Sequence, residues 1–237
     1  MVSIINRCIN YYKRKRYLSN SERFVEYLRN CGIKIGEGCK FRPKTTSIDL
    51  SRPSLVTIGH NCYMNENFTL LTHDWVSRVF IYSGRDFINS SGHVKIGNNV
   101  SFGQNVMILK GVTIGDNVFI GAGSIVTKDI PSNCVAVGIP CKKVYSLDDY
   151  YEKRKAASFG EAVEYARSIK ECLGREPRVE DFWEEFPLFL SGVEISKCHN
   201  LPVKRQLGPA YEHYCKHHKA RFDDFEDFIS AVFPEQQ

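Results

Sequence analysis

The chain has 237 residues, of which 43% are hydrophobic and 25% charged, and it carries a formal net charge of +5 at pH 7. This composition is typical of a soluble globular protein with one large domain or two. No stretch approaches the ~18 consecutive apolar residues of a membrane span. The charge is too diffuse for a nucleic-acid partner, although it suits an anionic small ligand.

The cysteines and the first residues bear on the cellular compartment. The nine cysteines are an odd number without a CxxC pair, which favours a reducing cytoplasm over a disulfide framework. The opening stretch MVSIINRCIN is too short and polar for the core of a signal peptide. We therefore expect a cytoplasmic protein. The basic run from Tyr11 to Arg16 suits acidic lipid near the inner membrane surface or a phosphate, but a solvated helix face is the commoner explanation of such a run.

Residues 1–31 are predicted to form an N-terminal helical cap. The stretch SNSE, Ser19 to Glu22, has the pattern of a capping box, and Gly32 is placed to end the helix. The apolar face of this helix comprises Phe24, Val25 and Leu28. Such a cap would cover the first edge of the repeat that follows, which otherwise invites aggregation.

Residues 32–145 carry an apolar residue at every sixth position. One series is Val94, Val100, Val106, Val112 and Val118, and a second is Ile96, Phe102, Ile108, Ile114, Ile120 and Val126. Helices bury residues at spacings of three and four positions, and ordinary strands bury every second residue. A strict period of six residues therefore predicts short strands and turns stacked as a solenoid. Between the apolar positions lie Gly, Asn and Asp, which suit tight corners. The same phase appears upstream in IKIGEGCKF and VTIGHNCYMNENFTL.

Residues 146–237 lack this rhythm and are predicted to form a C-terminal α-helical extension. Ser158 and Glu161 have the spacing of a second capping box, and Gly174 closes the apolar stripe that follows. The stripe comprises Phe159, Ala162, Val163, Ala166, Ile169 and Leu173, and a later one comprises Phe222, Phe225, Phe228, Ile229 and Val232. We expect both stripes to pack on the solenoid or on a neighbouring chain.

The string IGAGSIVTKDIPSNCVAVGIPCKKV, from Ile120 to Val144, resembles the hexapeptide-repeat acyltransferases, most closely the maltose, galactoside and xenobiotic acetyltransferase branch. The resemblance implies a left-handed parallel β-helix, although parallel crossovers are otherwise almost always right-handed. It also implies a homotrimer with active sites between subunits in a bacterial cytoplasm. The implied reaction passes an acetyl group from acetyl-CoA to a hydroxyl of a carbohydrate acceptor, and the long extension favours a polysaccharide or its precursor.

The six-residue phase breaks at THDW, Thr72 to Trp75, before a long irregular loop that ends at Val94. A long loop on a rigid scaffold is where function usually lies. In the resembling family the catalytic histidine precedes such a loop, which assigns the general base to His73. A neutral imidazole accepts the hydroxyl proton as the C–O bond forms, a contribution of about 10²–10⁴ in rate. Asp74 is expected to orient the ring, as a carboxylate does in a catalytic triad.

The resemblance also implies residues that hold the two substrates. By position, Ala122, Thr127 and Lys128 match residues that contact coenzyme A, and Lys142 matches a cation at its phosphates. Both lysines are also explained as exposed solubilising charges. On the acceptor side the loop contributes Trp75, Arg78 and Arg85, which suit a sugar or sugar phosphate. The same three side chains are equally explained by packing of the loop or by contact with a trimer neighbour.

Three other functions stay open at this point. An N-acetyltransferase acting on an amino sugar would need less basic assistance. A carbonic anhydrase on the same solenoid needs three metal-binding histidines, and His60, His73 and His93 lack its short spacing. A scaffold without activity would release no thiol from acetyl-CoA. We expect no bound metal, because His213 and His217 have the spacing of helical neighbours but no third ligand.

Overall fold

The computed structural model describes residues 17–195 and 197–234, so the basic run from Tyr11 to Arg16 lies outside the described residues. The chain divides into two compact units, residues 1–151 and 152–237, which are described in turn. No helix among the described residues is both long and apolar enough to cross a membrane.

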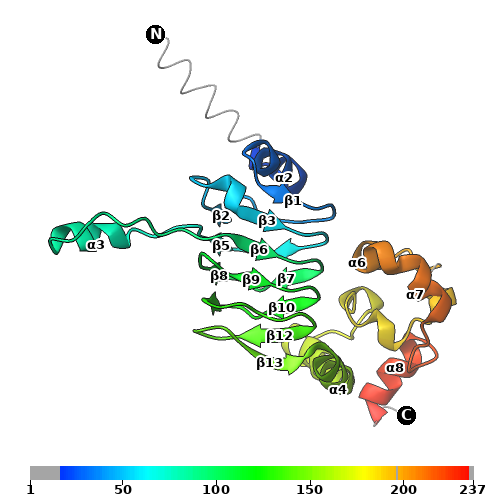
Figure 1. Cartoon of the computed structure of the whole chain (residues 1–237). Helices are drawn as coiled ribbons and strands as arrows, with labels where there is room; N and C mark the ends of the chain where they lie inside the picture. Colours follow the sequence, from blue (N-terminus) through cyan, green and yellow to red (C-terminus); the bar gives the residue numbers. More distant parts are fainter. Residues whose placement is uncertain (1–16, 196, 235–237) are drawn as a thin grey trace. The chain divides into compact units, whose positions relative to one another are not determined.

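The first unit is a coil of short strands that form three sheets (Figure 1). The first sheet contains β1 (Lys34–Ile35), β3 (Val56–Ile58), β6 (Val94–Ile96) and β9 (Thr113–Ile114). The second contains β4 (Tyr63–Met64), β7 (Val100–Phe102), β10 (Val118–Ile120), β12 (Cys134–Val137) and β13 (Lys142–Ser146). The third contains β2 (Ser47–Ile48), β5 (Thr69–Leu70), β8 (Met107–Ile108) and β11 (Ile125–Val126). All strand pairs are parallel except β12 with β13.

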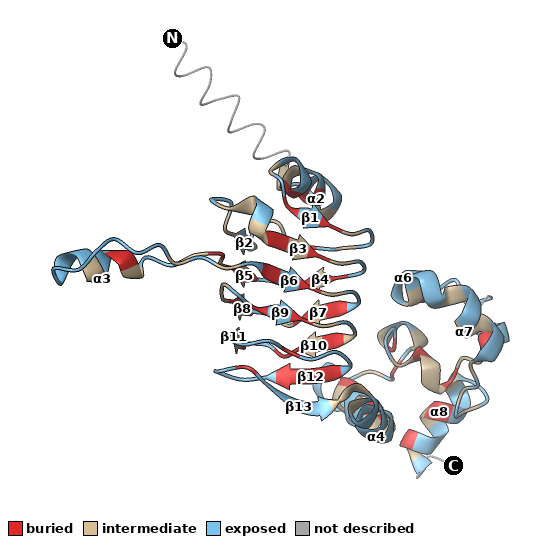
Figure 2. Cartoon of the chain, viewed as in Figure 1, coloured by how far each residue is buried: buried red, intermediate tan, exposed pale blue. Residues whose placement is uncertain are grey.

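This arrangement confirms the parallel, mainly β repeat that the six-residue period predicts, whereas its left-handed sense stays a prediction. Each apolar row stacks in register: Val118 pairs with Val100, and Ile120 pairs with Phe102. Both predicted apolar series are buried along the inside of the coil (Figure 2). The rings of Phe68 and Phe102 meet edge to face, with centroids 5.0 Å apart. Burial of these rows supplies about 25 cal/mol per Å² of apolar surface, which makes them the main source of the coil's stability.

The corners of the coil are held by asparagines in left-handed conformation. Positive φ angles between 54° and 59° occur at Asn61, Asn67, Asn99, Asn105, Asn117 and Asn133. Three hydrogen bonds link four of these side chains in a row from coil to coil: Asn61 donates to Asn99, Asn99 to Asn117 and Asn117 to Asn133. Asparagine tolerates this backbone and bonds locally, which explains its choice at the corners. Glycine serves close approach instead, since a Cβ on Gly97 would lie 2.7 Å from the carbonyl carbon of Gly115.

Helix α2 (Ser21–Asn30) precedes the first coil. Phe24, Val25 and Leu28 are buried in the core of the coil, as their spacing predicts. The predicted capping box is wrong by one position, because Asn20, not Ser19, accepts from the amide of Arg23 at 2.9 Å. The hydroxyl of Ser21 is free to accept from the amide of Phe41 (2.8 Å), which ties the helix to the coil.

The predicted loop after Trp75 is an arm, residues 75–89, that extends away from the coil (Figure 1). It is not wholly irregular, since α3 (Val76–Tyr82) lies within it. Its exposed large side chains are Trp75, Val79, Ile81, Tyr82, Phe87 and Ile88. A short 3-10 helix, η1 (Pro53–Leu55), interrupts an earlier coil between β2 and β3.

The second unit is helical, as predicted. Its elements follow α4 (Leu147–Leu173), which begins at the end of the first unit: η2 (Val179–Asp181), η3 (Phe186–Leu188), α5 (Gly192–Ile195), α6 (Val203–Leu207), η4 (Gly208–Ala210), α7 (Tyr211–His217) and α8 (Phe225–Val232). An aromatic-rich core includes Phe182, Phe189 and Phe228 together with Ala162, Ala166 and Ile169 of the first predicted stripe. Both stripes contribute to this core, which corrects the expectation that they pack on the solenoid or on a neighbouring chain. Leu173, the last member of that stripe, is exposed instead.

The predicted capping box at Ser158 and Glu161 is wrong, because both residues lie inside α4. The hydroxyl of Ser158 donates to the carbonyl of Lys155, and Glu161 pairs with Arg154. The helix begins at Leu147, where the preceding Ser146 hydroxyl accepts from the amide of Asp149 at 3.1 Å. Gly174 ends the helix with a φ of 62°, as its position predicts.

The asparagine ladder generates a stability prediction. Asn117→Ala should lower the free energy of unfolding by about 1 to 2 kcal/mol, because alanine is disfavoured in the left-handed region. Asn117→Gly removes the same side-chain hydrogen bonds without that conformational cost, so it should be less destabilising. Urea unfolding followed by circular dichroism measures both. An alanine variant as stable as the wild type would contradict the role of the corner asparagines.

Candidate functional site

The candidate site forms where two stacked coils bring a carboxylate to a histidine. Strands β2 and β5 pair in register, with Ile48 opposite Leu70, and the amide of Asp49 donates to the carbonyl of Leu70 at 2.9 Å. Asp49 therefore leaves the third sheet beside the segment that carries Thr72 and His73. The two residues are 24 positions apart in the sequence, but their side chains meet.

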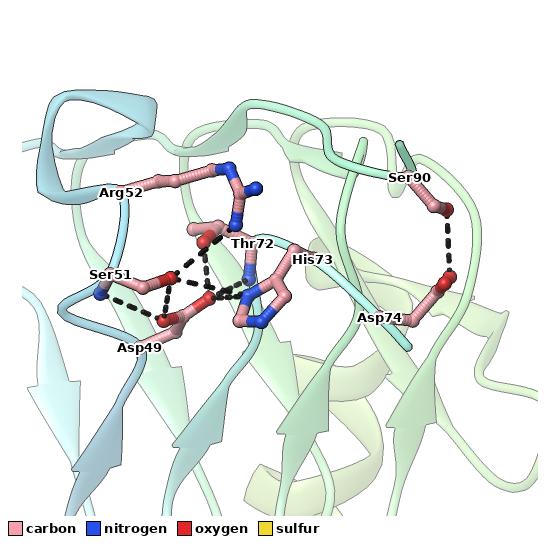
Figure 3. Close-up of polar contacts among 7 residues, drawn as sticks. All are labelled: Asp49, Ser51, Arg52, Thr72, His73, Asp74 and Ser90. Carbon is pink, nitrogen blue, oxygen red and sulfur yellow. Dashed lines mark hydrogen bonds and ion pairs between the residues drawn. The ribbon is translucent and has the colours of Figure 1, made fainter. Parts of the chain in front are cut away.

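The contacts among these side chains are short and numerous (Figure 3). His73 Nδ1 lies 2.5 Å from Asp49 Oδ2. The hydroxyl and the amide of Thr72 donate to the same carboxylate oxygen. The hydroxyl and the amide of Ser51 donate to Asp49 Oδ1 at 2.7 and 2.9 Å. The Asp49 side chain is 8% exposed and that of His73 is 21% exposed, so the carboxylate is sheltered while the ring still reaches solvent.

These hydrogen bonds fix the charge of the carboxylate. Burial by itself raises the pKa of Asp49, but the hydrogen bonds from Thr72, Ser51 and His73 outweigh it and hold that pKa well below its usual range. An ionised carboxylate only accepts hydrogen bonds. We therefore assign the ring hydrogen of neutral His73 to Nδ1, which leaves the lone pair of Nε2 available as a proton acceptor.

The structure corrects the expectation for Asp74. Its carboxylate does not orient the ring of His73; it anchors the arm. Asp74 Oδ2 accepts from the hydroxyl of Ser90 at 3.0 Å and lies 3.1 Å from Lys110 Nζ (Figure 3 draws the first contact). Lys110 Nζ also lies 2.5 Å from the Ser90 hydroxyl. Adjacent residues point apart along an extended backbone, so Asp74 and His73 face different neighbours.

We call Asp74, Ser90 and Lys110 the clasp. Backbone bonds strengthen it, because His73 pairs with Ser91 as an antiparallel bridge and the amide of Gly92 donates to the carbonyl of Thr72 at 2.9 Å. The clasp thus joins the two ends of the arm to the next coil. It also fixes the backbone of His73 from the side opposite to Asp49.

Of the predicted acceptor residues, Trp75 lies close to His73, and Arg78 lies close to Trp75. The ring of Trp75 stands edge-on to the imidazole with centroids 5.8 Å apart, and the guanidinium of Arg78 lies 5.5 Å from the centroid of the Trp75 ring. Arg85 is held elsewhere on the arm, where it donates to the hydroxyl of Ser83 at 2.7 Å. The Trp75 ring therefore joins the imidazole to the guanidinium of Arg78, and Arg85 takes no part in these contacts.

The predicted cofactor residues are exposed at the far end of the coil. Ala122 follows β10, Thr127 and Lys128 follow β11, and Lys142 begins β13. Within the part of the chain that the structure describes, no hydrogen bond or ion pair joins these four residues to His73. Their role as a coenzyme A site stays a prediction. In the same described residues, no group of three His, Cys, Asp or Glu side chains is arranged to hold a metal ion.

Sequence reasoning missed Asp49, Ser51 and Thr72 as partners of His73. Regular coils repeat every 18 residues, as the bond between Asn99 and Asn117 shows, whereas Asp49 and His73 are 24 apart. The insertion at η1 changes the spacing. The sequence offered one signal for Asp49 as a site residue. It is a lone carboxylate that directly follows the inward-facing Ile48, in a stretch where the six-residue repeat is interrupted.

Comparison with known proteins settles the family. Residues 93–128 match the family described as "Bacterial transferase hexapeptide (six repeats)". Over 140 residues the chain is 39% identical to Protein CapG of Staphylococcus aureus, a match that covers 59% of this chain and 77% of CapG. The chain belongs to the hexapeptide-repeat transferase family. The predicted resemblance is thereby confirmed.

Two further known proteins are similar to the chain. It is 48% identical over 103 residues to galactoside O-acetyltransferase of Escherichia coli K12, a match covering 41% of this chain and 49% of that protein. The chain thus spans about half the length of this relative. The solved structure of a galactoside acetyltransferase in complex with coenzyme A has 27% identity and a TM-score of 0.41, and the match covers 62% of this chain and 82% of that one.

The buried carboxylate predicts a pH-dependent loss of stability. A carboxylate whose pKa is lowered by folding stabilises the protein above its unfolded pKa of about 3.9, and that stability is lost progressively as the pH falls from this value to the lower pKa of the folded state. Asp49→Asn should therefore lower the free energy of unfolding by about 1 to 3 kcal/mol at pH 7. The difference from wild type should shrink below about pH 4.

Urea unfolding at pH 7, 5 and 3.5 measures this difference. Asp86→Asn, on an exposed carboxylate of the arm, is the matched control and should leave stability unchanged at every pH. A deficit in Asp49→Asn that stays constant from pH 7 to 3.5 would contradict the ionised, hydrogen-bonded carboxylate.

The clasp predicts that Lys110 limits opening of the arm. Lys110→Met removes the ion pair with Asp74, so trypsin should cut the arm after Arg78 or Arg85 about two- to fivefold faster, as expected for loss of a partly exposed pair. Mass spectrometry of timed digests locates and quantifies the cuts. Lys95→Met, on an exposed lysine of β6, controls for the loss of a lysine. Equal rates of cleavage in the two variants would show that the clasp does not restrain the arm.

Proposed function

We propose that the chain is an acetyl-CoA-dependent O-acetyltransferase that acetylates a hydroxyl of a sugar or polysaccharide precursor, with His73 as the general base. The proposal depends on one observation above all: the imidazole is held by an ionised carboxylate beside a surface of Trp75 and Arg78. Membership in a family whose relatives are named acetyltransferases supports the reaction class. A relative solved in complex with coenzyme A supports acetyl-CoA as the acyl donor.

In the proposed reaction the acceptor hydroxyl gives its proton to Nε2 of His73 while its oxygen attacks the thioester carbonyl. The imidazolium that forms is stabilised by the Asp49 carboxylate at 2.5 Å. The tetrahedral intermediate then breaks its C–S bond, and the proton passes from Nε2 to the departing thiolate. Atoms and charges balance without an acyl-enzyme, because the acetyl group moves directly from sulfur to oxygen. Backbone amides at a coil corner supply the oxyanion donors in this proposal.

The proposal includes a left-handed coil and a homotrimer with the site between subunits. The exposed apolar side chains of the arm support an assembly, since a chain rarely leaves a run of such residues in water. In this arrangement Ala122, Thr127, Lys128 and Lys142 of one subunit hold coenzyme A, and Arg85 serves contact between copies or the acceptor. Residues 1–31 act as a cap in this proposal, and a cytoplasmic location remains part of it.

The test is a free-thiol assay with acetyl-CoA across sugar, oligosaccharide and amino-sugar acceptors, run on the wild type and on His73→Ala. Loss of the general base should lower the rate by at least about a hundredfold. Circular dichroism confirms that the variant is folded. Full activity of His73→Ala would remove His73 from the mechanism, exclusive use of amino sugars would favour N-acetyl transfer, and no thiol release with any acceptor would favour a scaffold.

A further inference from the structure

We propose that Arg52 binds an anionic group of the acceptor, which makes the acceptor an acidic sugar with a carboxylate or phosphate near the acetylated hydroxyl. This inference rests on the proposed function, since it assigns the substrate class of the same site. Neither the six-residue repeat nor the resemblance to the family points to this residue.

The backbone around Arg52 directs its side chain to the site. The amide of Ser51 donates to Asp49 Oδ1 at 2.9 Å, which turns the chain sharply after β2. Pro53 follows Arg52 and disfavours the helical conformation there, and the backbone of Arg52 has a φ of −139° and a ψ of 63°. The Asp49 carboxylate that holds the imidazole therefore also sets the direction of the arginine.

The guanidinium lies close to the imidazole. Arg52 Nη1 is 3.5 Å from the hydroxyl of Ser51, and that hydroxyl is 3.3 Å from His73 Nδ1 (Figure 3). Arg52 is partly exposed, and the contact with Ser51 is the one hydrogen bond that its guanidinium makes within the described residues. A ligand whose hydroxyl meets His73 would bring its neighbouring substituents within reach of this guanidinium.

The positive charge of Arg52 has no carboxylate partner in the described part of the chain. Asp49 already accepts from Thr72, Ser51 and His73, and Asp74 is paired with Lys110 in the clasp. By contrast, Arg29, Arg154 and Arg175 each pair with a carboxylate. Both carboxylates of the site are thus engaged, whereas Arg52 and Arg78 leave a positive surface around the imidazole.

This surface matches the chemistry of an acidic sugar. A guanidinium binds a carboxylate or phosphate through two parallel hydrogen bonds, which gives both affinity and orientation. The exposed ring of Trp75 offers an apolar face for the sugar ring. Together they would hold the anion on one side and the acetylated hydroxyl at Nε2 of His73 on the other.

The test compares galactose, galacturonate and galactose 6-phosphate, which differ only at C6. Binding is measured by isothermal titration without acetyl-CoA, and turnover by the free-thiol assay, on wild type, Arg52→Gln and Arg52→Lys. Wild type should favour at least one anionic sugar over galactose by about tenfold or more, as expected for a charge-assisted pair. Arg52→Gln should abolish that preference, Arg52→Lys should retain part of it, and the KM for acetyl-CoA should not change.

Arg42→Gln, on an exposed arginine of the preceding loop, is the matched control and should behave as wild type. The proposal is overturned if wild type binds the three sugars equally, if Arg42→Gln has the same effect as Arg52→Gln, or if Arg52→Gln raises the KM for acetyl-CoA instead. If the wild type transfers no acetyl group to any acceptor, the proposed function fails. The titration then still decides whether Arg52 binds the anion.

Discussion

The register between stacked coils is the constraint on which the rest of the structure depends. Because β2 and β5 pair with Ile48 opposite Leu70, Asp49 emerges beside Thr72 and His73. A slip by one residue would turn Ile48 outward and Asp49 into the apolar interior. The buried rows that stabilise the coil therefore also define the geometry of the site. The same strand pairings therefore determine both the fold and the geometry of the site, so a change in register would alter both.

Two carboxylates near the imidazole have separate tasks. Asp49, nearly buried, holds the ring and, in the proposed reaction, stabilises the charge that forms on it. Asp74, exposed, joins Ser90 and Lys110 and so ties the arm to the coil. This division leaves the ring rigid while the arm presents Trp75 and Arg78 beside it. With both carboxylates engaged, Arg52 gives the open side of the site a positive charge.

Much of the fold was predictable because its cause is local and periodic. The six-residue rows are buried as their spacing requires, and Asn99 and Asn117 have the left-handed backbone that their corners need. The predictions of helix caps at Ser19 and Ser158 were wrong. Several neighbouring polar residues can serve as the cap, and tertiary packing decides which of them does. The break in the repeat together with the resemblance to the family predicted His73 as the base. Its partner Asp49 was not predicted, because the insertion at η1 hides the coil-to-coil spacing that joins them.

The central claim is that Asp49 holds His73 with its hydrogen on Nδ1 and its lone pair on Nε2. Nitrogen NMR of the imidazole, in protein labelled at histidine and assigned with His73→Ala, measures this tautomer directly. The account predicts a protonated Nδ1 and an unprotonated Nε2 for the neutral ring, and loss of that preference in Asp49→Asn. A neutral ring with its hydrogen on Nε2 would contradict the account, because that nitrogen could not then accept a proton from the acceptor.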